Sequence, residues 1–170
     1  MARELLFRVD SRLVHGQVCT AWIPQLSVKR VVIIHDAYAK DEFLVKLHQS
    51  VVPSSCICDT ITAAEAIKQW NENQFGEDNT IVIFQDVATA CRLFEMGLPF
   101  KELQIATLAG TRQSVSVYKQ VNVTREDALR MLELVAKGVT PYCQMYPQDP
   151  KVPVKDLLSN RRTAAKLKLN

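Results

Sequence analysis

Short runs of apolar, β-branched residues constrain the fold of this chain more than any other feature of its sequence. Two of these runs, Val31–Ile34 and Thr80–Phe84, do not alternate between apolar and polar residues. Continuous runs of this length are typical of parallel strands that are buried on both faces of a sheet. Such a sheet needs helices on both sides, and segments with helical spacing separate the runs. The sequence therefore predicts an α/β fold.

We expect a single domain over residues 1–170, built on an open, mostly parallel twisted sheet of about seven strands with helices on both faces. A chain of 170 residues is long enough for one such core and too short for two comfortable ones. The partial alternation of Val115–Val123 predicts an edge strand, the one candidate for an antiparallel orientation. The expected strands are Leu5–Phe7, Val31–Ile34, Cys56–Ile61, Thr80–Phe84, Leu103–Ala106, Val115–Val123 and Tyr142–Tyr146.

Apolar residues at helical spacing predict the helices between these strands. The first helix should end or kink near Pro24, which cannot donate to the helical ladder. His48 is expected at the surface because it is offset from the apolar set of its own helix. The apolar sets are Val18, Ala21, Trp22 and Leu26; then Phe43, Leu44, Leu47 and Val51; and, facing inward after Thr124, Ala128, Leu132, Val135 and Ala136. Two more helices are expected after the capping box Thr62–Glu65 and over Val87–Met96.

A histidine, His15, stands where the first strand gives way to the first helix, with Arg8, Asp10 and Arg12 just before it. An unperturbed histidine is largely neutral at pH 7, and a neutral imidazole is a good nucleophile. Transfer of a phosphoryl group requires positive charge and hydrogen-bond donors around the phosphate oxygens. Arginine and the first turn of a helix provide both. The segment is therefore a candidate phosphoryl site with His15 as the acceptor.

The neighbours of His15 have chemical roles in this hypothesis. Arg12 suits phosphate oxygens because its guanidinium binds bidentately. Gly16 has no Cβ to crowd an approaching anion, and the backbone amides of Gly16 and Gln17 lie in the first helical turn. Asp10 is a candidate for orienting the ring by accepting a hydrogen bond from one nitrogen. It can equally fix an arginine or cap the helix.

The stretch Arg8–Val18, followed by Trp22, closely resembles the start of the IIB components of the sugar phosphotransferase system, mannose/fructose/sorbose class. In that family a strand is followed by the pattern R-x-D-x-R-L-x-H-G-Q, whose histidine is the phosphorylation site. This chain reads RVDSRLVHGQ and does not depart from the pattern. The resemblance extends over nearly the whole chain in length and order of elements, although its specificity lies in this stretch.

The resemblance implies that the chain is a phosphocarrier. His15 is expected to take a phosphoryl group, at Nδ1, from a phosphohistidine on a IIA partner and to pass it to a sugar held by membrane-embedded IIC and IID partners. Arg12 would bind the phosphate, with Arg8 and Asp10 in support. No cofactor or metal is implied, because the donor is itself a phosphoprotein. The sugar is expected to be chosen by the membrane components, and the oligomeric state, a homo-oligomer included, stays open.

The composition, with 48% hydrophobic and 23% charged residues, is ordinary for a globular protein. A net charge of +3 argues against a nucleic-acid-binding footprint as the main feature. There is no dinucleotide-binding or P-loop motif. No apolar run approaches the roughly 20 residues that span a bilayer, and charged residues interrupt the region where a signal peptide would be apolar. We therefore expect a cytoplasmic protein that associates peripherally with its membrane partners.

The five cysteines are expected to be reduced structural thiols. Their number is odd, and none of their spacings fits a zinc site or a CxxC pair. A thiol redox function would need a low-pKa cysteine at a helix start, whereas Cys19 lies a turn inside its helix. A non-enzymatic α/β module that binds an anion or another ligand is the alternative to the phosphocarrier.

Polar residues follow two other strands at the carboxyl edge of the sheet, where open α/β sheets bind ligands. His35 and Asp36 are interpreted as a loop contact near the site rather than as metal ligands. Arg112, in the loop Leu108–Arg112, is either a second phosphate or partner contact or a solvated turn residue.

Residues 149–170 differ in character from the rest of the chain, with six basic against two acidic side chains. Val154, Leu157 and Leu158 predict a short helix that docks on the body. The basic end beyond it is interpreted as a solvated, partly disordered terminus, in preference to a contact with acidic lipid headgroups or the membrane partners.

Overall fold

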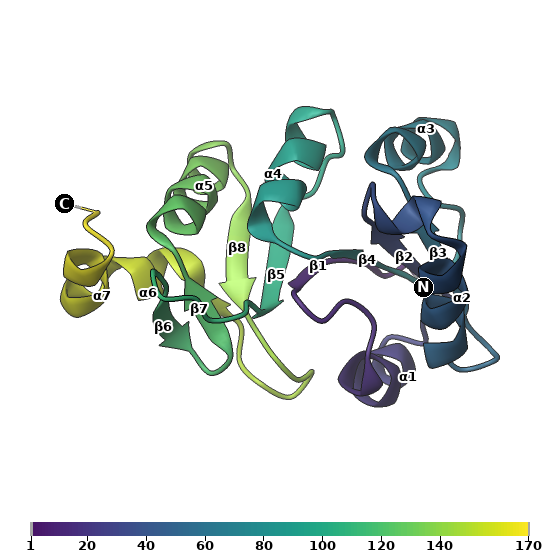
Figure 1. The fold of residues 1–170 in the computed structure, drawn as a ribbon, viewed down its shortest axis with the longest axis horizontal. Coiled ribbons are helices and arrows are strands. Elements are labelled where there is room, and N and C mark those ends of the chain that lie inside the picture. The colour runs from purple at the N-terminus through teal and green to yellow at the C-terminus, as the bar shows by residue number, and fades with distance from the viewer. Residues whose placement is uncertain (1, 170) are drawn as a thin grey trace.

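The computed structural model describes residues 2–169 and shows a seven-stranded sheet in the order β3-β2-β4-β1-β5-β8-β9 (Figure 1). Neighbouring strands are parallel except at one edge, where β9 is antiparallel to β8. The expected open, mostly parallel sheet is confirmed. Its strands are β1 (Leu5–Asp10), β2 (Arg30–Ile34), β3 (Ile57–Ile61), β4 (Thr80–Phe84), β5 (Glu102–Thr107), β8 (Thr140–Cys143) and β9 (Val152–Pro153).

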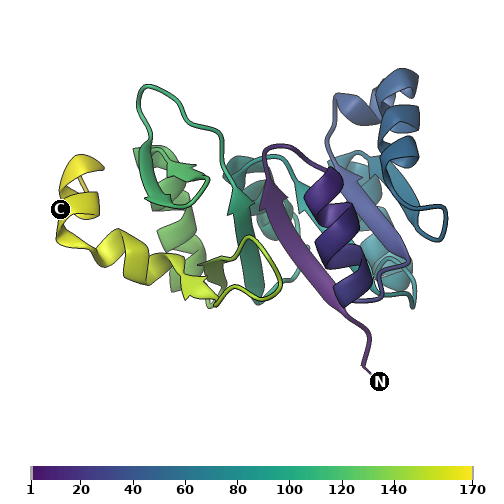
Figure 2. The same cartoon turned by 90° about the horizontal axis from the view of Figure 1, so that it is seen from below.

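Helices cover both faces of this sheet. In Figure 1, α3, α4 and α5 lie along one face, and Figure 2 shows the first helix, which ends in α1, lying beside β1 on the other. None of the helices within residues 2–169 combines the length and the apolar character needed to cross a membrane. The helices are α1 (Ile23–Gln25), α2 (Glu42–Val51), α3 (Ala63–Asn73), α4 (Val87–Glu95), α5 (Arg125–Ala136), α6 (Val154–Ser159) and α7 (Arg161–Lys166), with a π-helical turn at Val18–Trp22 and a 3₁₀ turn at Tyr38–Lys40.

Each central strand contributes to two hydrophobic cores, because successive side chains of a strand point to opposite faces of the sheet. In β2, Val32 and Ile34 pack in the core under α3, α4 and α5. Val31 and Ile33 pack in the second core, with Val18 and other residues of the first helix. The continuous β-branched run is thus buried on both sides, as the sequence predicts.

The segment Val115–Val123 was expected as one edge strand, and this expectation is wrong. It forms a separate antiparallel hairpin of β6 (Val115–Tyr118) and β7 (Val121–Val123). Lys119 adopts a positive φ of 36° in the turn between them, so the chain reverses in the middle of the segment. The antiparallel edge strand of the main sheet is the two-residue β9 instead.

The helix α2 exposes three of the four apolar residues that its spacing marked as a set, and Leu44 is half-buried. Phe43 is 72% exposed, and Leu47 and Val51 are exposed as well. The expectation of a surface His48 is wrong, because His48 is buried and its Nδ1 lies 2.8 Å from the hydroxyl of Thr60 in β3. The physical reason is that α2 packs on β3, the strand at the edge of the sheet, so only a narrow side of the helix is covered.

The buried face of α5 is rotated slightly from the expected one. Ala128, Met131 and Leu134 are its buried residues, whereas Leu132 and Val135 are half-buried and Ala136 is exposed. Thr124 caps the helix by accepting a hydrogen bond from Asp127 N, as its sequence suggested.

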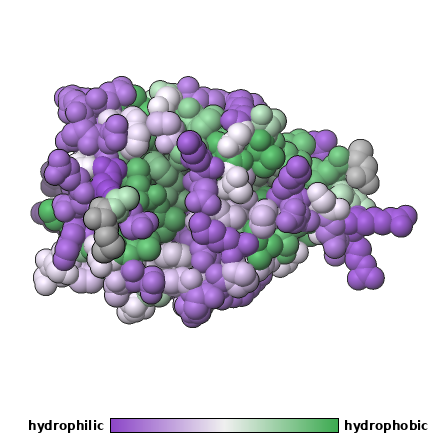
Figure 3. Space-filling view, turned by 180° about the vertical axis from the view of Figure 1, so that it is seen from behind, coloured by the Kyte–Doolittle hydropathy of each residue, from purple (hydrophilic) through white to green (hydrophobic). Residues whose placement is uncertain are grey.

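The expected docking helix is present as α6, with Val154 and Leu158 buried. The expectation of a partly disordered end beyond it is wrong for the described residues up to 169. Asn160 caps a further helix, α7, and Leu167 after it is only 2% exposed. The burial of Leu167 anchors this end, while hydrophilic side chains project from the α7 side of the molecule (Figure 3).

Candidate active site

The loop after β1 brings Asp10 and His15 together. Leu13 N donates to Asp10 O at 2.9 Å, which closes a turn, and buried Leu13 adopts a positive φ of 59°. Such a conformation costs about 1–3 kcal/mol for a residue other than glycine and is often found at functional sites. Cys19 N then donates to His15 O at 3.1 Å and closes the first helical turn, so His15 stands at the N-cap, just before Gly16.

The first helix contains a π-helical turn over Val18–Trp22, in which Ile23 N donates to Val18 O. Pro24 has no N–H to donate and its ring crowds the preceding turn, and a wider turn relieves that crowding. The helix ends at Gln25, close to where Pro24 predicts.

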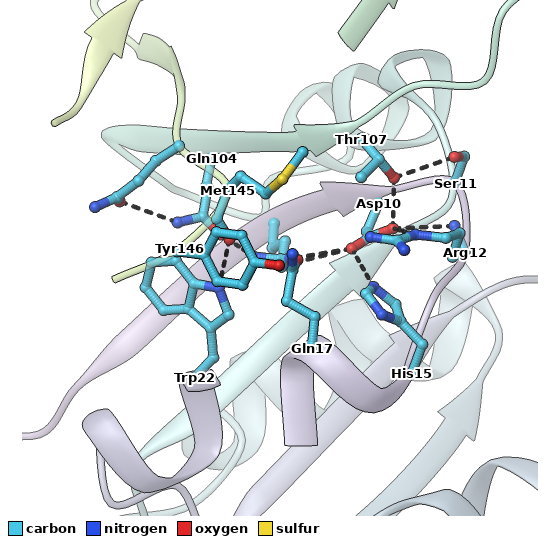
Figure 4. A network of polar contacts seen from close by, with 12 residues as sticks. Asp10, Ser11, Arg12, His15, Gln17, Trp22, Gln104, Thr107, Met145 and Tyr146 are labelled. Atoms are coloured by element: carbon cyan, nitrogen blue, oxygen red, sulfur yellow. Dashed lines mark hydrogen bonds and ion pairs between the residues drawn. The ribbon is translucent and has the colours of Figure 1, made fainter. Parts of the chain in front are cut away.

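Asp10 accepts hydrogen bonds on both carboxylate oxygens (Figure 4). Oδ2 lies 2.8 Å from His15 Nε2 and 2.9 Å from Arg8 Nη2. Oδ1 lies 2.6 Å from Thr107 Oγ1 and 3.0 Å from Arg12 N. Burial alone raises the pKa of Asp10, but the hydrogen bond from His15, the charge of Arg8 and the hydrogen bond from Thr107 outweigh it, so this pKa lies well below its ordinary value.

His15 is held through Nε2. An ionised carboxylate only accepts, so Nε2 is the protonated nitrogen of the neutral ring and Nδ1 carries the lone pair. The side chain is 17% exposed. The hydrogen bond to Asp10 therefore fixes Nε2 of the ring and leaves the lone pair of the neutral ring on Nδ1.

Arg8 is fully buried below this carboxylate. Its guanidinium donates to Asp10, to Gln104 Oε1 at 2.6 Å and to Gln17 Oε1 at 3.0 Å, and it lies 5.5 Å from the ring centre of Trp22. Burial lowers the pKa of Arg8, and the charge of Asp10 acts against that shift. Arg8 is thus a structural counter-charge for Asp10, out of reach of solvent.

Arg12 is placed differently from Arg8. Its side chain is 45% exposed, and its Nε lies 3.8 Å from Asp10 Oδ1. Within residues 2–169 its guanidinium has no hydrogen-bond partner, so its donors remain available for an anion. Gly16 is exposed at the start of the helix, where a Cβ would meet no atom within 4 Å. The side chain of Gln17 accepts a hydrogen bond from Arg8. The backbone N–H of Gln17 lies in the first helical turn, where N–H groups have no partner within the helix.

Sequence reasoning missed Thr107 and Gln104, which both belong to β5. In the parallel pairing of β1 with β5, Arg8 lies opposite Gln104 and Asp10 lies opposite Thr107. Gln104 Nε2 also donates to Gln144, so Arg8 is linked to the loop after β8. One signal was available, because a glutamine in the middle of an apolar strand must find a partner when it is buried.

His35 and Asp36 lie at the carboxyl edge but make loop contacts of their own. His35 Nε2 lies 2.9 Å from Gln85 Oε1, and Asp36 accepts from Ala63 N and from Arg92. These bonds tie together the loops after β2, β3 and β4, which fits the interpretation as loop contacts. Arg112 is exposed, and no hydrogen bond or ion pair joins it to another described residue.

The thiols give no support to a redox function. All five cysteines are free, and burial raises the pKa of Cys19. Burial also raises the pKa of Cys58 and of Cys143 to about 12. Within residues 2–169, no group of three or more His, Cys, Asp or Glu side chains is arranged to hold a metal ion.

Known proteins of one kind are similar to this chain. The mannose-specific EIIAB component of the phosphotransferase system from Escherichia coli K12 is 27% identical over 91% of this chain, which spans only 48% of that protein. The fructose-specific EIIB component from Bacillus subtilis is 26% identical over 94% of this chain and 98% of its own length.

Solved structures show the same fold. The IIB domain of the sorbose permease from Klebsiella pneumoniae superposes with a TM-score of 0.84 at 23% identity, covering 93% of this chain and 98% of that one. The manxB structure from Thermoanaerobacter tengcongensis superposes with a TM-score of 0.84 at 29% identity, covering 93% of this chain and 96% of that one. The family model described as PTS system sorbose subfamily IIB component matches residues 4–168. The chain therefore belongs to the sorbose-subfamily IIB components of the sugar phosphotransferase system.

Proposed function

We propose that His15 is the phosphoryl acceptor of this IIB component, and that the group is attached to Nδ1. The observation that carries the proposal is the 2.8 Å contact between His15 Nε2 and the buried Asp10 carboxylate. This contact holds the hydrogen on Nε2 and leaves the lone pair on Nδ1. The family's general role, as phosphocarrier in the sugar phosphotransferase system, supplies the reaction.

In the first step the Nδ1 lone pair attacks the phosphorus of a phosphohistidine on a IIA partner. The new N–P bond forms while the donor's N–P bond breaks, and the electron pair of the broken bond returns to the donor imidazole. The His15 ring then carries positive charge, which the ionised Asp10 beside Nε2 stabilises. Because Arg8 neutralises Asp10 from the buried side, the carboxylate can stay ionised in this poorly solvated position.

Arg12 and the helix start bind the transferred phosphoryl group in this proposal. The Arg12 guanidinium is exposed beside Asp10, and charge spreads over the equatorial phosphate oxygens during transfer. The backbone amides of Gly16 and Gln17 belong to the first helical turn, which favours an anion. Neither a cofactor nor a metal takes part in this scheme.

In the second step the phosphoryl group passes from His15 to a sugar bound by IIC and IID partners in the membrane. A sugar hydroxyl gives up its proton to solvent as its oxygen forms the new O–P bond, and the pair of the broken N–P bond returns to Nδ1. We propose that residues 1–170 act as a single IIB domain, with 149–170 as its C-terminal part, on the cytoplasmic side of that complex. The name of the Escherichia coli relative, EIIAB, supports a IIA partner.

The experiment is to incubate the protein with phosphoenolpyruvate, the general phosphotransferase proteins and a matching IIA protein, and to measure intact mass. One acid-labile phosphoryl group per chain is expected, and none in His15→Ala. His48→Ala serves as a matched control because His48 bonds only within the fold. A label that persists in His15→Ala would contradict the proposal. Reversible phosphate binding without any label would favour the anion-binding module.

A further inference from the structure

Thr107 donates to the Asp10 oxygen that His15 does not use. Thr107 Oγ1 lies 2.6 Å from Oδ1, and the residue is 3% exposed. Both His15 and Arg8 bind Oδ2. A rotation of the carboxylate would therefore break hydrogen bonds on both of its oxygens.

A bulge in the sheet puts Thr107 in this position. β1 and β5 pair Arg8 with Gln104 and Val9 with Ile105, and the register then shifts so that Asp10 pairs with Thr107. In an unbroken register Asp10 would pair with Ala106, which has no hydroxyl. Bulges re-aim side chains and are common beside active sites. Ser11 N donates to Thr107 O at 3.1 Å and continues the pairing beyond the bulge.

The direction of the hydrogen bond follows from the chemistry of the two groups. A hydroxyl has one proton, and an ionised carboxylate only accepts, so Thr107 donates its proton to Asp10. The contact of 3.2 Å between Thr107 Oγ1 and Ser11 Oγ is then donated by Ser11. Thr107 has no proton left for another acceptor, and its hydroxyl is committed to Asp10.

We propose that Thr107 is a positioning residue for phosphoryl transfer, because its hydroxyl fixes the rotation of the Asp10 carboxylate and thereby the tautomer of His15. With Oδ1 held, Oδ2 points to Nε2 and the lone pair stays on Nδ1. Without the hydroxyl, Oδ1 keeps only the Arg12 amide as a donor, so the carboxylate turns more freely and the neutral ring populates both tautomers. The effect on transfer rests on the proposed function, whereas the tautomer is a property of the free protein.

The test compares Thr107→Val, which removes the hydroxyl at constant size, with Thr107→Ser, which keeps it. Thr60→Val is a matched control, since it removes another buried threonine hydroxyl that bonds a histidine, His48, away from Asp10. Long-range ¹H–¹⁵N spectra of the neutral rings report the tautomer. The His15 Nε2–H tautomer is expected in the native protein, Thr107→Ser and Thr60→Val, and a mixture is expected in Thr107→Val.

Transfer from the phosphorylated IIA protein provides the second readout. Because Thr107→Val removes a hydrogen bond to a charged group, kcat should fall roughly 10–100-fold while KM for the partner is unchanged. Thr107→Ser should restore most of the rate. If Thr107→Val does not fold, Thr107→Cys, with its weak S–H donor, replaces it, and its kcat should lie below that of Thr107→Ser.

Two results would overturn the proposal. One is a native tautomer in Thr107→Val, and the other is a mixed tautomer with native kcat. If no variant and not even the native protein accepts a phosphoryl group, the proposed function fails, and the spectra still decide whether Thr107 positions the ring.

Discussion

Asp10 Oδ2 lies 2.8 Å from His15 Nε2, and the same oxygen is 2.9 Å from the Nη2 of buried Arg8. One carboxylate thus joins the partly exposed His15 ring to the fully buried Arg8 cation. The Asp10 carboxylate beside His15 is kept ionised by the buried positive charge of Arg8.

Asp10→Asn should destabilise the fold as well as abolish normal transfer. The substitution leaves the Arg8 charge buried without a counter-charge, and breaking a buried pair in this way costs about 3–5 kcal/mol. Urea unfolding measures the loss. Asp36→Asn is the control, since the Asp36–Arg92 pair is half-exposed and should contribute less than about 1 kcal/mol. Equal losses of unfolding free energy in the two variants would show that the buried Arg8 charge does not need Asp10 as its counter-charge.

The stability that Asp10 contributes should depend on pH. Its folded pKa is depressed, so the contribution is full above the unfolded pKa of about 4 and is lost as the pH falls towards the folded pKa. The difference in unfolding free energy between the native protein and Asp10→Asn should shrink by about 1.4 kcal/mol per pH unit below about pH 4. Denaturant titrations from neutral to acid pH check this. A constant difference would mean that the Asp10 pKa is not lowered by folding.

Substitutions of Arg12 and Arg8 should affect different quantities, phosphoryl transfer in the first case and the free energy of unfolding in the second. Arg12→Ala removes an exposed donor group, so transfer should fall about 10²–10³-fold with unfolding free energy changed by less than about 1 kcal/mol. The loss stays partial because the backbone donors remain. Arg8→Ala should instead lower the unfolding free energy strongly, because it leaves Asp10 buried and unpaired. Native transfer in Arg12→Ala would remove Arg12 from the phosphate site.

Phe43→Ser tests which side of α2 is packed. Phe43 is 72% exposed, so the unfolding free energy should change by no more than about 0.5 kcal/mol. Phe7→Ala, in the core, should cost about 3–5 kcal/mol by comparison. A loss in Phe43→Ser as large as that in Phe7→Ala would show that Phe43 is covered.

Local pattern was enough to predict the central strands and the loop that carries His15. The β-branched runs mark the central strands, and Asp10, Arg12 and His15 lie within six residues of one another, so their proximity needs no long-range information. Asp10 was also expected to orient the ring, and the structure places it there.

Long-range packing decided what the pattern could not. Thr107 meets Asp10 through a register shift between strands that lie far apart in the sequence, and no local signal encodes that shift. Helical spacing in α2 marked Phe43, Leu44, Leu47 and Val51 as a set without telling which side an edge strand would cover, and three of them are exposed. The turn at Lys119 likewise divided an alternating run that resembles one strand.

The nitrogen that carries the phosphoryl group tests the central claim most directly. Protein with ¹⁵N-labelled histidine rings is phosphorylated through its IIA partner, and long-range ¹H–¹⁵N spectra with ³¹P coupling are recorded before acid treatment. We predict phosphorus on Nδ1 of His15, with the hydrogen of Nε2 still bonded to Asp10. Phosphorus on Nε2, or on another residue, would contradict the account, because Nε2 is the nitrogen that Asp10 occupies.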